Sequence, residues 1–195
     1  MDIESHPFTP FLPSSAKLLM LGTFPPAQKR WCMEFYYPNF TNDMWRIFGI
    51  CFFGDKQHFV LAEQKRYNLE EIVPFLNHYG IAMYDTCTKI CRTKNTASDK
   101  DLMVVERTDL DDMLRKLPEC KAVITAGQLA TAIFCEHYNI SEPKVGEYSE
   151  FTLDNRTIRL YRMPSSSRAY PMKTEQKAVA YDVVFNWLWE KERYV

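Results

Sequence analysis

Short, continuous runs of apolar residues alternate along this chain with longer amphipathic segments. Four of the runs have the length and composition of strands buried on both faces of a sheet. They are Lys17-Leu18-Leu19-Met20-Leu21, Ile81-Ala82-Met83-Tyr84, Ala122-Val123-Ile124-Thr125 and Ile158-Arg159-Leu160-Tyr161-Arg162-Met163. Phe151-Thr152-Leu153 precedes the last run, and Asp154-Asn155-Arg156 between the two predicts a hairpin turn.

The segments between these runs have the apolar periodicity of helices. Thr108 followed by Asp111 is typical of a capping box, and residues 128–138 after Gly127 form a second predicted helix. A closing helix is indicated near the end of the chain by apolar residues that share one face. These are Ala178, Tyr181, Val184, Phe185 and Leu188.

Alternating strands and helices predict an α/β fold, a three-layer α/β/α sandwich around a small, mostly parallel four-stranded sheet. The 195 residues suffice for one domain, and residues 1–15, rich in Pro and Ser, are expected to form an irregular arm. No apolar run approaches the roughly 18 residues of a membrane span. Met1-Asp2-Ile3-Glu4 also lacks a basic signal region, so we expect a cytoplasmic protein without a membrane partner.

Composition and missing motifs exclude several kinds of chemistry. The net charge of −1 argues against a protein that coats nucleic acid, although it leaves room for a locally basic cleft. None of the six cysteines forms a C-x-x-C pair, and the four histidines lack metal-site spacing, so we expect no metal and place the histidines at the surface or at caps. There is no phosphate-binding G-x-x-x-x-G-K-[ST] or G-x-G-x-x-G loop and no G-x-S-x-G elbow. We expect no cofactor.

Two loops rich in Gly, Pro and Ser follow the first and last predicted strands, at residues 21–26 and 163–171. Ligands of open parallel sheets bind outside the carboxyl ends of the strands. The two loops therefore predict one cleft that holds a small planar substrate.

The order of the motifs resembles the uracil-DNA glycosylase superfamily, most closely its hypoxanthine (deoxyinosine) DNA glycosylases. The Pro-Ser-Ser-Ser segment is also similar to the mismatch-specific thymine/uracil branch. The segments that carry the resemblance are G-T-F-P-P from Gly22, Y-Y-P-N-F-T-N-D-M-W from Tyr36, M-Y-D-T from Met83, A-G at Ala126 and M-P-S-S-S-R-A from Met163.

The resemblance implies a monofunctional glycosylase of base excision repair, acting as a monomer. It would hydrolyse the N-glycosidic bond of a flipped deaminated base, uracil or hypoxanthine, in double- or single-stranded DNA.

Asn42 is the implied catalytic residue, because its amide can both donate to and accept from a water molecule. The alternative role of Asn42 is to cap the helix that follows. Phe24 lies where other branches carry a catalytic Asp or Asn, so it can only stack on a base or support its loop. This departure fits the hypoxanthine branch, and it fits equally a relative that has lost activity.

The implied base-binding residues are Gly22, Thr23, Phe24, Tyr37 and Asp85. Asp85 would accept the ring N–H of uracil or hypoxanthine, or else cap the following turn. One of Tyr36 and Tyr37 is expected to wall the pocket and the other to join the core, as does Trp45.

Ser165, Ser166 and Ser167 are implied as a phosphate clamp, with an ordinary turn as the alternative. Arg168 would enter the duplex or hold a phosphate, or else remain solvated. Lys89, Arg92 and Lys94 could follow the DNA backbone.

Two other functions stay open. A non-catalytic domain that binds a base, a nucleotide or damaged DNA is favoured by the apolar Phe24 and Ala126. A hydrolase of free nucleosides would have little need of the serine loop.

Overall fold

The main sheet of the computed structural model has five strands in the order β5-β2-β8-β10-β9. The structure describes residues 2–94, 98–190 and 192–193. The strands are β1 (Ile3–Ser5), β2 (Leu18–Gly22), β3 (Val60–Leu61), β4 (Arg66–Tyr67), β5 (Ile81–Asp85), β6 (Cys87–Arg92), β7 (Leu102–Arg107), β8 (Ala122–Ala126), β9 (Tyr148–Leu153) and β10 (Arg156–Met163). The helices are α1 (Met44–Phe53), α2 (Leu69–Tyr79), α3 (Leu110–Arg115), α4 (Gln128–Tyr138) and α5 (Thr174–Trp189), with short 3-10 turns at Gln28–Arg30 and Asp99–Asp101.

Parallel pairing brings the carboxyl ends of β5, β2, β8 and β10 to one edge of the sheet. Gly22 at the end of β2 is in register with Asp85 at the end of β5. Met163 at the end of β10 is in register with Ala126 at the end of β8. The four loops that leave these strands therefore start side by side.

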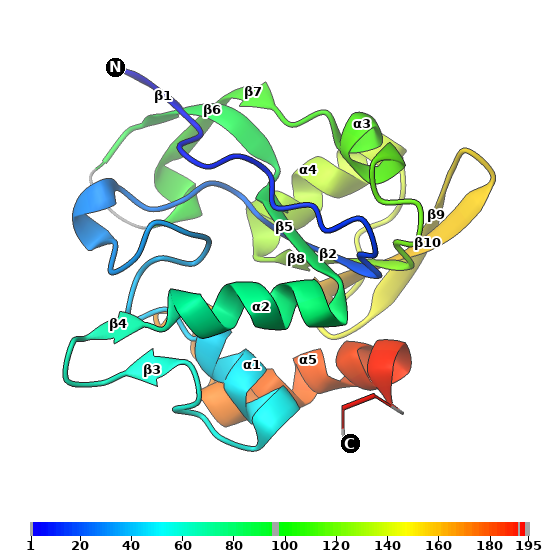
Figure 1. Ribbon diagram of the computed structural model, residues 1–195. Coiled ribbons are helices and arrows are strands. Elements are labelled where there is room, and N and C mark those ends of the chain that lie inside the picture. The colour runs from blue at the N-terminus through cyan, green and yellow to red at the C-terminus, as the bar shows by residue number, and fades with distance from the viewer. Residues whose placement is uncertain (1, 95–97, 191, 194–195) are drawn as a thin grey trace.

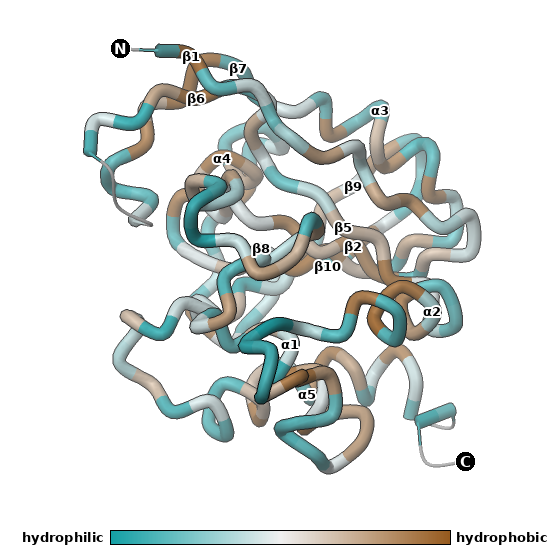
Figure 2. Tube along the Cα trace, turned by 60° about the vertical axis from the view of Figure 1, so that its left-hand side comes forward, coloured by the Kyte–Doolittle hydropathy of each residue, from teal (hydrophilic) through white to brown (hydrophobic). Residues whose placement is uncertain are grey.

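Helices cover both faces of the sheet. Figure 1 shows α1, α2 and α5 below it and α3 and α4 above it, so the three-layer α/β fold is confirmed. The apolar segments of the chain gather in the central strands, as the brown parts of the tube in Figure 2 indicate. Phe48 of α1 stacks on Phe185 of α5 with ring centroids 5.2 Å apart, which joins the two helices of the lower layer. Across the described residues, no helix is long and apolar enough to cross a membrane.

The predicted elements are largely present, with two corrections. The four apolar runs form β2, β5, β8 and β10, and the second predicted helix is α4. The sheet has five strands where four were expected, because β9 extends the predicted hairpin as an antiparallel edge strand. The N-cap of α3 is Asp109, whose carboxylate accepts from the Asp112 N–H at 3.0 Å, and Thr108 instead donates its hydroxyl to the Asp85 carbonyl.

The N-terminal arm is not irregular throughout, which corrects the prediction for residues 1–15. Ile3–Ser5 form β1, which pairs antiparallel with β6 in a second sheet of order β1-β6-β7. Phe11 forms a bridge with Met83 of β5. These contacts with distant strands order a segment whose own composition favours no regular structure.

Candidate functional site

A cleft of about 1100 Å³ opens at the carboxyl ends of the parallel strands. Its walls come from the loops that follow β2, β5, β8 and β10, together with the segment before α1. All the residues predicted to catalyse, to bind the base or to form the phosphate clamp and wedge line this cleft. These are Gly22, Thr23, Phe24, Tyr37, Asn42, Asp85, Ser165, Ser166, Ser167 and Arg168.

Asp85 is held at the floor of the cleft by His6, a contact that the sequence did not predict. His6 Nε2 lies 2.8 Å from Asp85 Oδ2, and the His6 side chain is only 2% exposed. The expectation that the histidines lie at the surface or at caps is therefore wrong for His6. A Cβ added at Gly22 would lie 2.5 Å from Asp85 Oδ1, so only glycine lets the end of β2 approach this carboxylate so closely.

Asp99 is a second carboxylate in the cleft, and sequence reasoning missed it. The hydroxyl of Thr23 donates to Asp99 Oδ2 at 2.8 Å. Burial raises the pKa of Asp99 above its ordinary value, and the nearby charge of Asp85 adds to the effect. Nothing in the local sequence marks Asp99, because the short turn at Asp99–Asp101 is brought to β2 only by the fold.

Both predicted tyrosines line the cleft, and Tyr36 also belongs to the core. Tyr36 donates to the Thr9 carbonyl at 2.8 Å. The Tyr37 hydroxyl is buried and has no hydrogen-bond partner among the described residues. Burial raises its pKa well above the ordinary value, so it remains a neutral donor. Phe24 lies edge-on to His6 at 5.2 Å between ring centroids.

The N-cap residue of α1 is Asp43, so Asn42, considered for that role, lies one residue before it and contacts the first turn from there. Asn42 Oδ1 accepts from the Met44 N–H at 2.9 Å, at the first turn of α1. The side-chain nitrogen of Asn42 donates to none of the described residues. Asn42 itself lines the cleft. The contact with Met44 fixes the orientation of the amide and leaves its donor side for a ligand.

The serine loop is fastened to α1 and α5 by a buried ion pair. Lys177 Nζ of α5 lies 3.0 Å from Asp43 Oδ2 and 2.7 Å from the Ser167 carbonyl oxygen. The Asp43 N–H donates to the Ser166 carbonyl at 2.8 Å. Arg168 Nη2 lies 3.1 Å from Asp43 Oδ1, while the side chain stays 58% exposed. The sequence pointed to neither Asp43 nor Lys177.

Four cationic side chains line the cleft, namely Arg30, Arg92, Lys100 and Arg168. Of the three predicted backbone-tracking residues, only Arg92 is among them. Its guanidinium is occupied by Glu4, at 2.9 Å, and by the Pro25 carbonyl, at 2.6 Å. Lys89 instead pairs with Glu106 at 2.7 Å.

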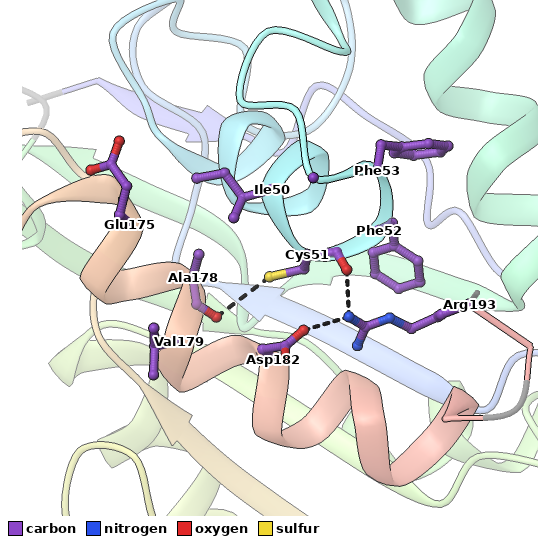
Figure 3. A pocket seen from close by; sticks show the side chains of 10 residues that line it. Ile50, Cys51, Phe52, Phe53, Glu175, Ala178, Val179, Asp182 and Arg193 are labelled. Atoms are coloured by element: carbon purple, nitrogen blue, oxygen red, sulfur yellow. Dashed lines mark hydrogen bonds and ion pairs between the residues drawn. The ribbon is translucent and has the colours of Figure 1, made fainter.

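A smaller cavity of about 490 Å³ lies between α1 and α5 (Figure 3). The Arg193 side chain closes one side of it and donates to the Cys51 carbonyl and to Asp182. Burial raises the pKa of the Cys51 thiol to about 12, so this thiol is not a reactive group at neutral pH. None of the predicted site residues lines this cavity. Across the described residues, no three His, Cys, Asp or Glu side chains form a group that could hold a metal ion.

Comparison with solved structures identifies a protein with the same fold. It comes from Methanosarcina acetivorans, and its solution NMR structure is described as that of a "putative Uracil DNA glycosylase". The TM-score is 0.63 at 20% sequence identity, over 96% of this chain and 99% of that chain. At this identity the likeness establishes the fold alone. No protein-family model and no curated protein matches the sequence.

Proposed function

We propose that this protein is a monofunctional DNA glycosylase that removes a flipped, deaminated base, uracil or hypoxanthine, from DNA. The observation that carries the proposal is the meeting of five segments, distant in the sequence, in one cleft at the carboxyl ends of the strands. Their order resembles that of the uracil-DNA glycosylase superfamily. The shared fold with the archaeal protein gives independent support.

In the proposed reaction, the target nucleotide leaves the duplex and its base enters the cleft. Asp85 accepts the ring N–H that uracil and hypoxanthine both carry, and Phe24 and Tyr37 contact the faces and edge of the base. The His6 contact supports this assignment, because it fixes the position of the Asp85 carboxyl group at the end of β5.

Asn42 positions the water that attacks C1′ of the sugar. The oxygen of the water bonds to C1′, and the electron pair of the N-glycosidic bond leaves with the base. The serine loop and Arg168 hold the phosphates that flank the extruded nucleotide. The supporting contact is the Asp43–Lys177 pair, which fastens this loop to the first turn of α1 beside Asn42.

Base release from labelled oligonucleotides tests the proposal directly. Duplexes and single strands carrying uracil, hypoxanthine or mismatched thymine are incubated with the protein, and abasic sites are cleaved with alkali. We expect release from uracil or hypoxanthine. Asn42→Ala and Asn42→Ser should both reduce the rate by about 10²-fold or more, as expected when a positioned polar group is lost.

The two Asn42 variants separate catalysis from capping. Serine keeps an oxygen that can cap α1, so only Asn42→Ala should also lose about 1 kcal/mol of the free energy of unfolding. Asp109→Ala, which removes the N-cap contact of α3 outside the cleft, serves as the control. A wild-type rate in Asn42→Ser would reduce the role of Asn42 to the cap.

The second candidate function is a domain that binds a damaged base without cutting it. The apolar Phe24 in the wall of the cleft favours it, because this side chain has no polar atom that could position or activate a water. It would be supported by tight binding of a lesion duplex with no release of base from any oligonucleotide. Release from free nucleosides alone would instead support the nucleoside hydrolase.

A further inference from the structure

Hydrolysis of an N-glycosidic bond needs a group that accepts the proton of the attacking water. Positive charge develops on the sugar in the transition state, and the attacking water must lose a proton. Asn42 can orient a water but cannot accept its proton. Of the described residues that line the cleft, only Asp85 and Asp99 carry carboxylates.

The two carboxylates have different surroundings. Asp85 is engaged by His6 at 2.8 Å and lies against the Cα of Gly22, which leaves it suited to a fixed hydrogen bond with a base. Asp99 accepts from the neutral hydroxyl of Thr23 at 2.8 Å. The Arg92 guanidinium makes its contacts with Glu4 and the Pro25 carbonyl, so it is not paired with Asp99.

Asp99 is also fastened to the loop that carries Phe24. Thr23, its hydrogen-bond donor, immediately precedes Phe24. Gly127, just before α4, is a neighbour of Asp99, since a Cβ added there would lie in ordinary contact with Asp99 Oδ2 at 3.6 Å. The buried Tyr37 hydroxyl, which has no partner among the described residues, lies in the same cleft and is influenced by the charges of both carboxylates. A buried donor without a partner among the described residues is available to a polar ligand in this cleft.

We propose that Asp99 is a catalytic residue, the base that accepts the proton of the attacking water. This inference rests on the proposed function. As the water oxygen bonds to C1′, its proton passes to Asp99, and the electron pair of the C1′–N bond leaves with the base. The departing base then takes up one proton, so that water and the deoxynucleotide become an abasic site and a free base. The carboxylate also offsets the positive charge on the sugar.

The raised pKa of Asp99 suits this role. Burial shifts it in the direction of neutral pH, and a base is most effective when its pKa lies near the working pH. The carboxylate must be ionised to accept a proton, so the rate should fall as the pH drops through the pKa of Asp99. In a plot of rate against pH, the midpoint of the fall at low pH (the acidic limb) should lie above the ordinary pKa of an aspartate, about 3.9.

Asp99→Asn tests the proposal, because the amide oxygen can still accept from Thr23 while the negative charge is lost. We expect the single-turnover rate of base release to fall by about 10²-fold or more and the acidic limb to disappear. Binding of a lesion duplex, measured by fluorescence anisotropy, should be retained. Asp101→Asn, in the same short turn but outside the cleft lining, is the matched control and should keep the wild-type rate.

Thr23→Val provides a second variant in case Asp99→Asn fails to fold. Loss of the hydroxyl that stabilises the carboxylate should raise the pKa of Asp99 further and move the acidic limb to higher pH. An active wild type whose rate and limb survive in Asp99→Asn, or whose limb does not move in Thr23→Val, would overturn the inference and leave the proposed function intact. A wild type that releases no base from any oligonucleotide would overturn the proposed function instead.

Discussion

Gly22 determines how closely two strands of the site approach each other. Its Cα faces Asp85 across the register of β2 and β5, where any side chain would meet the carboxylate. The carboxylate is held from the other side by His6. The position of the Asp85 carboxylate therefore depends on one missing methyl group and one imidazole.

Gly22→Ala should displace Asp85, because the new Cβ would lie 2.5 Å from its Oδ1. We expect the fold to be retained and base release to fall by about 10²-fold, the effect typical of a displacement near 1 Å in a catalytic site. Single-turnover assays measure the rate, and thermal unfolding monitors the fold.

Introducing Gly22→Ala into the Asp85→Ser variant shows whether Gly22→Ala lowers base release by displacing Asp85. With the carboxylate removed, Gly22→Ala should add little to the loss already caused by Asp85→Ser. Strictly additive losses in the double variant would contradict this explanation.

At the scale of the elements, the Asp43–Lys177 pair joins α1, α5 and the serine loop. Lys177 is completely buried, and its ammonium is shared between Asp43 and the Ser167 carbonyl. Removing one member of a buried ion pair leaves an uncompensated charge and destabilises proteins by about 3–5 kcal/mol. The same change would release the loop from α1.

Lys177→Met should therefore lower the free energy of unfolding by about 3–5 kcal/mol in urea denaturation. Binding of a lesion duplex should also weaken, because the serine loop loses its contact with α5. Adding Asp43→Asn should recover part of the lost stability, since it removes a buried carboxylate whose remaining partner, Arg168, is 58% exposed.

Lys56→Met is the matched control for this pair. The Lys56–Glu175 ion pair also joins α5 to the segment that follows α1, but both of its side chains are exposed. Screening by water makes such pairs weak, so this variant should unfold like the wild type. Equal destabilisation by the two lysine substitutions would refute the special role of Lys177.

At the scale of the whole molecule, charge is distributed unevenly. The chain carries a net charge of −1, yet Arg30, Arg92, Lys100 and Arg168 gather around the cleft. Local placement rather than net charge decides the field that a ligand meets. A polyanion bound in the cleft would therefore contact cations on several of its sides.

Binding of duplex DNA should weaken linearly in a plot of log K against log salt, with a slope of about −0.9 for each phosphate neutralised. Arg30→Ala should reduce the magnitude of this slope by about 1, since Arg30 is exposed at the cleft. Fluorescence anisotropy over a salt series measures it. Arg115→Ala, on α3 and outside the cleft lining, should leave the slope unchanged; an equal change in both variants would argue against DNA in this cleft.

The sequence by itself determined the parallel core and the place of the cleft. Strands buried on both faces must be continuously apolar, so β2, β5, β8 and β10 were visible as runs, and α4 was visible from its periodicity. Because the carboxyl ends of parallel strands meet at one edge, the loops that follow them were expected to converge. The residues predicted to catalyse, to bind the base or to form the phosphate clamp and wedge all line one cleft, while their chemical roles remain predictions.

Only the tertiary structure decided which groups meet inside that cleft. His6 and Asp85 are separated by 79 positions, Thr23 and Asp99 by 76, and Asp43 and Lys177 by 134. Local periodicity reports which residues share a face of one element and carries no information on contacts between distant segments. A lysine in a helix is ordinarily exposed, so the burial of Lys177 followed only from the packing of α5 against α1 and the serine loop.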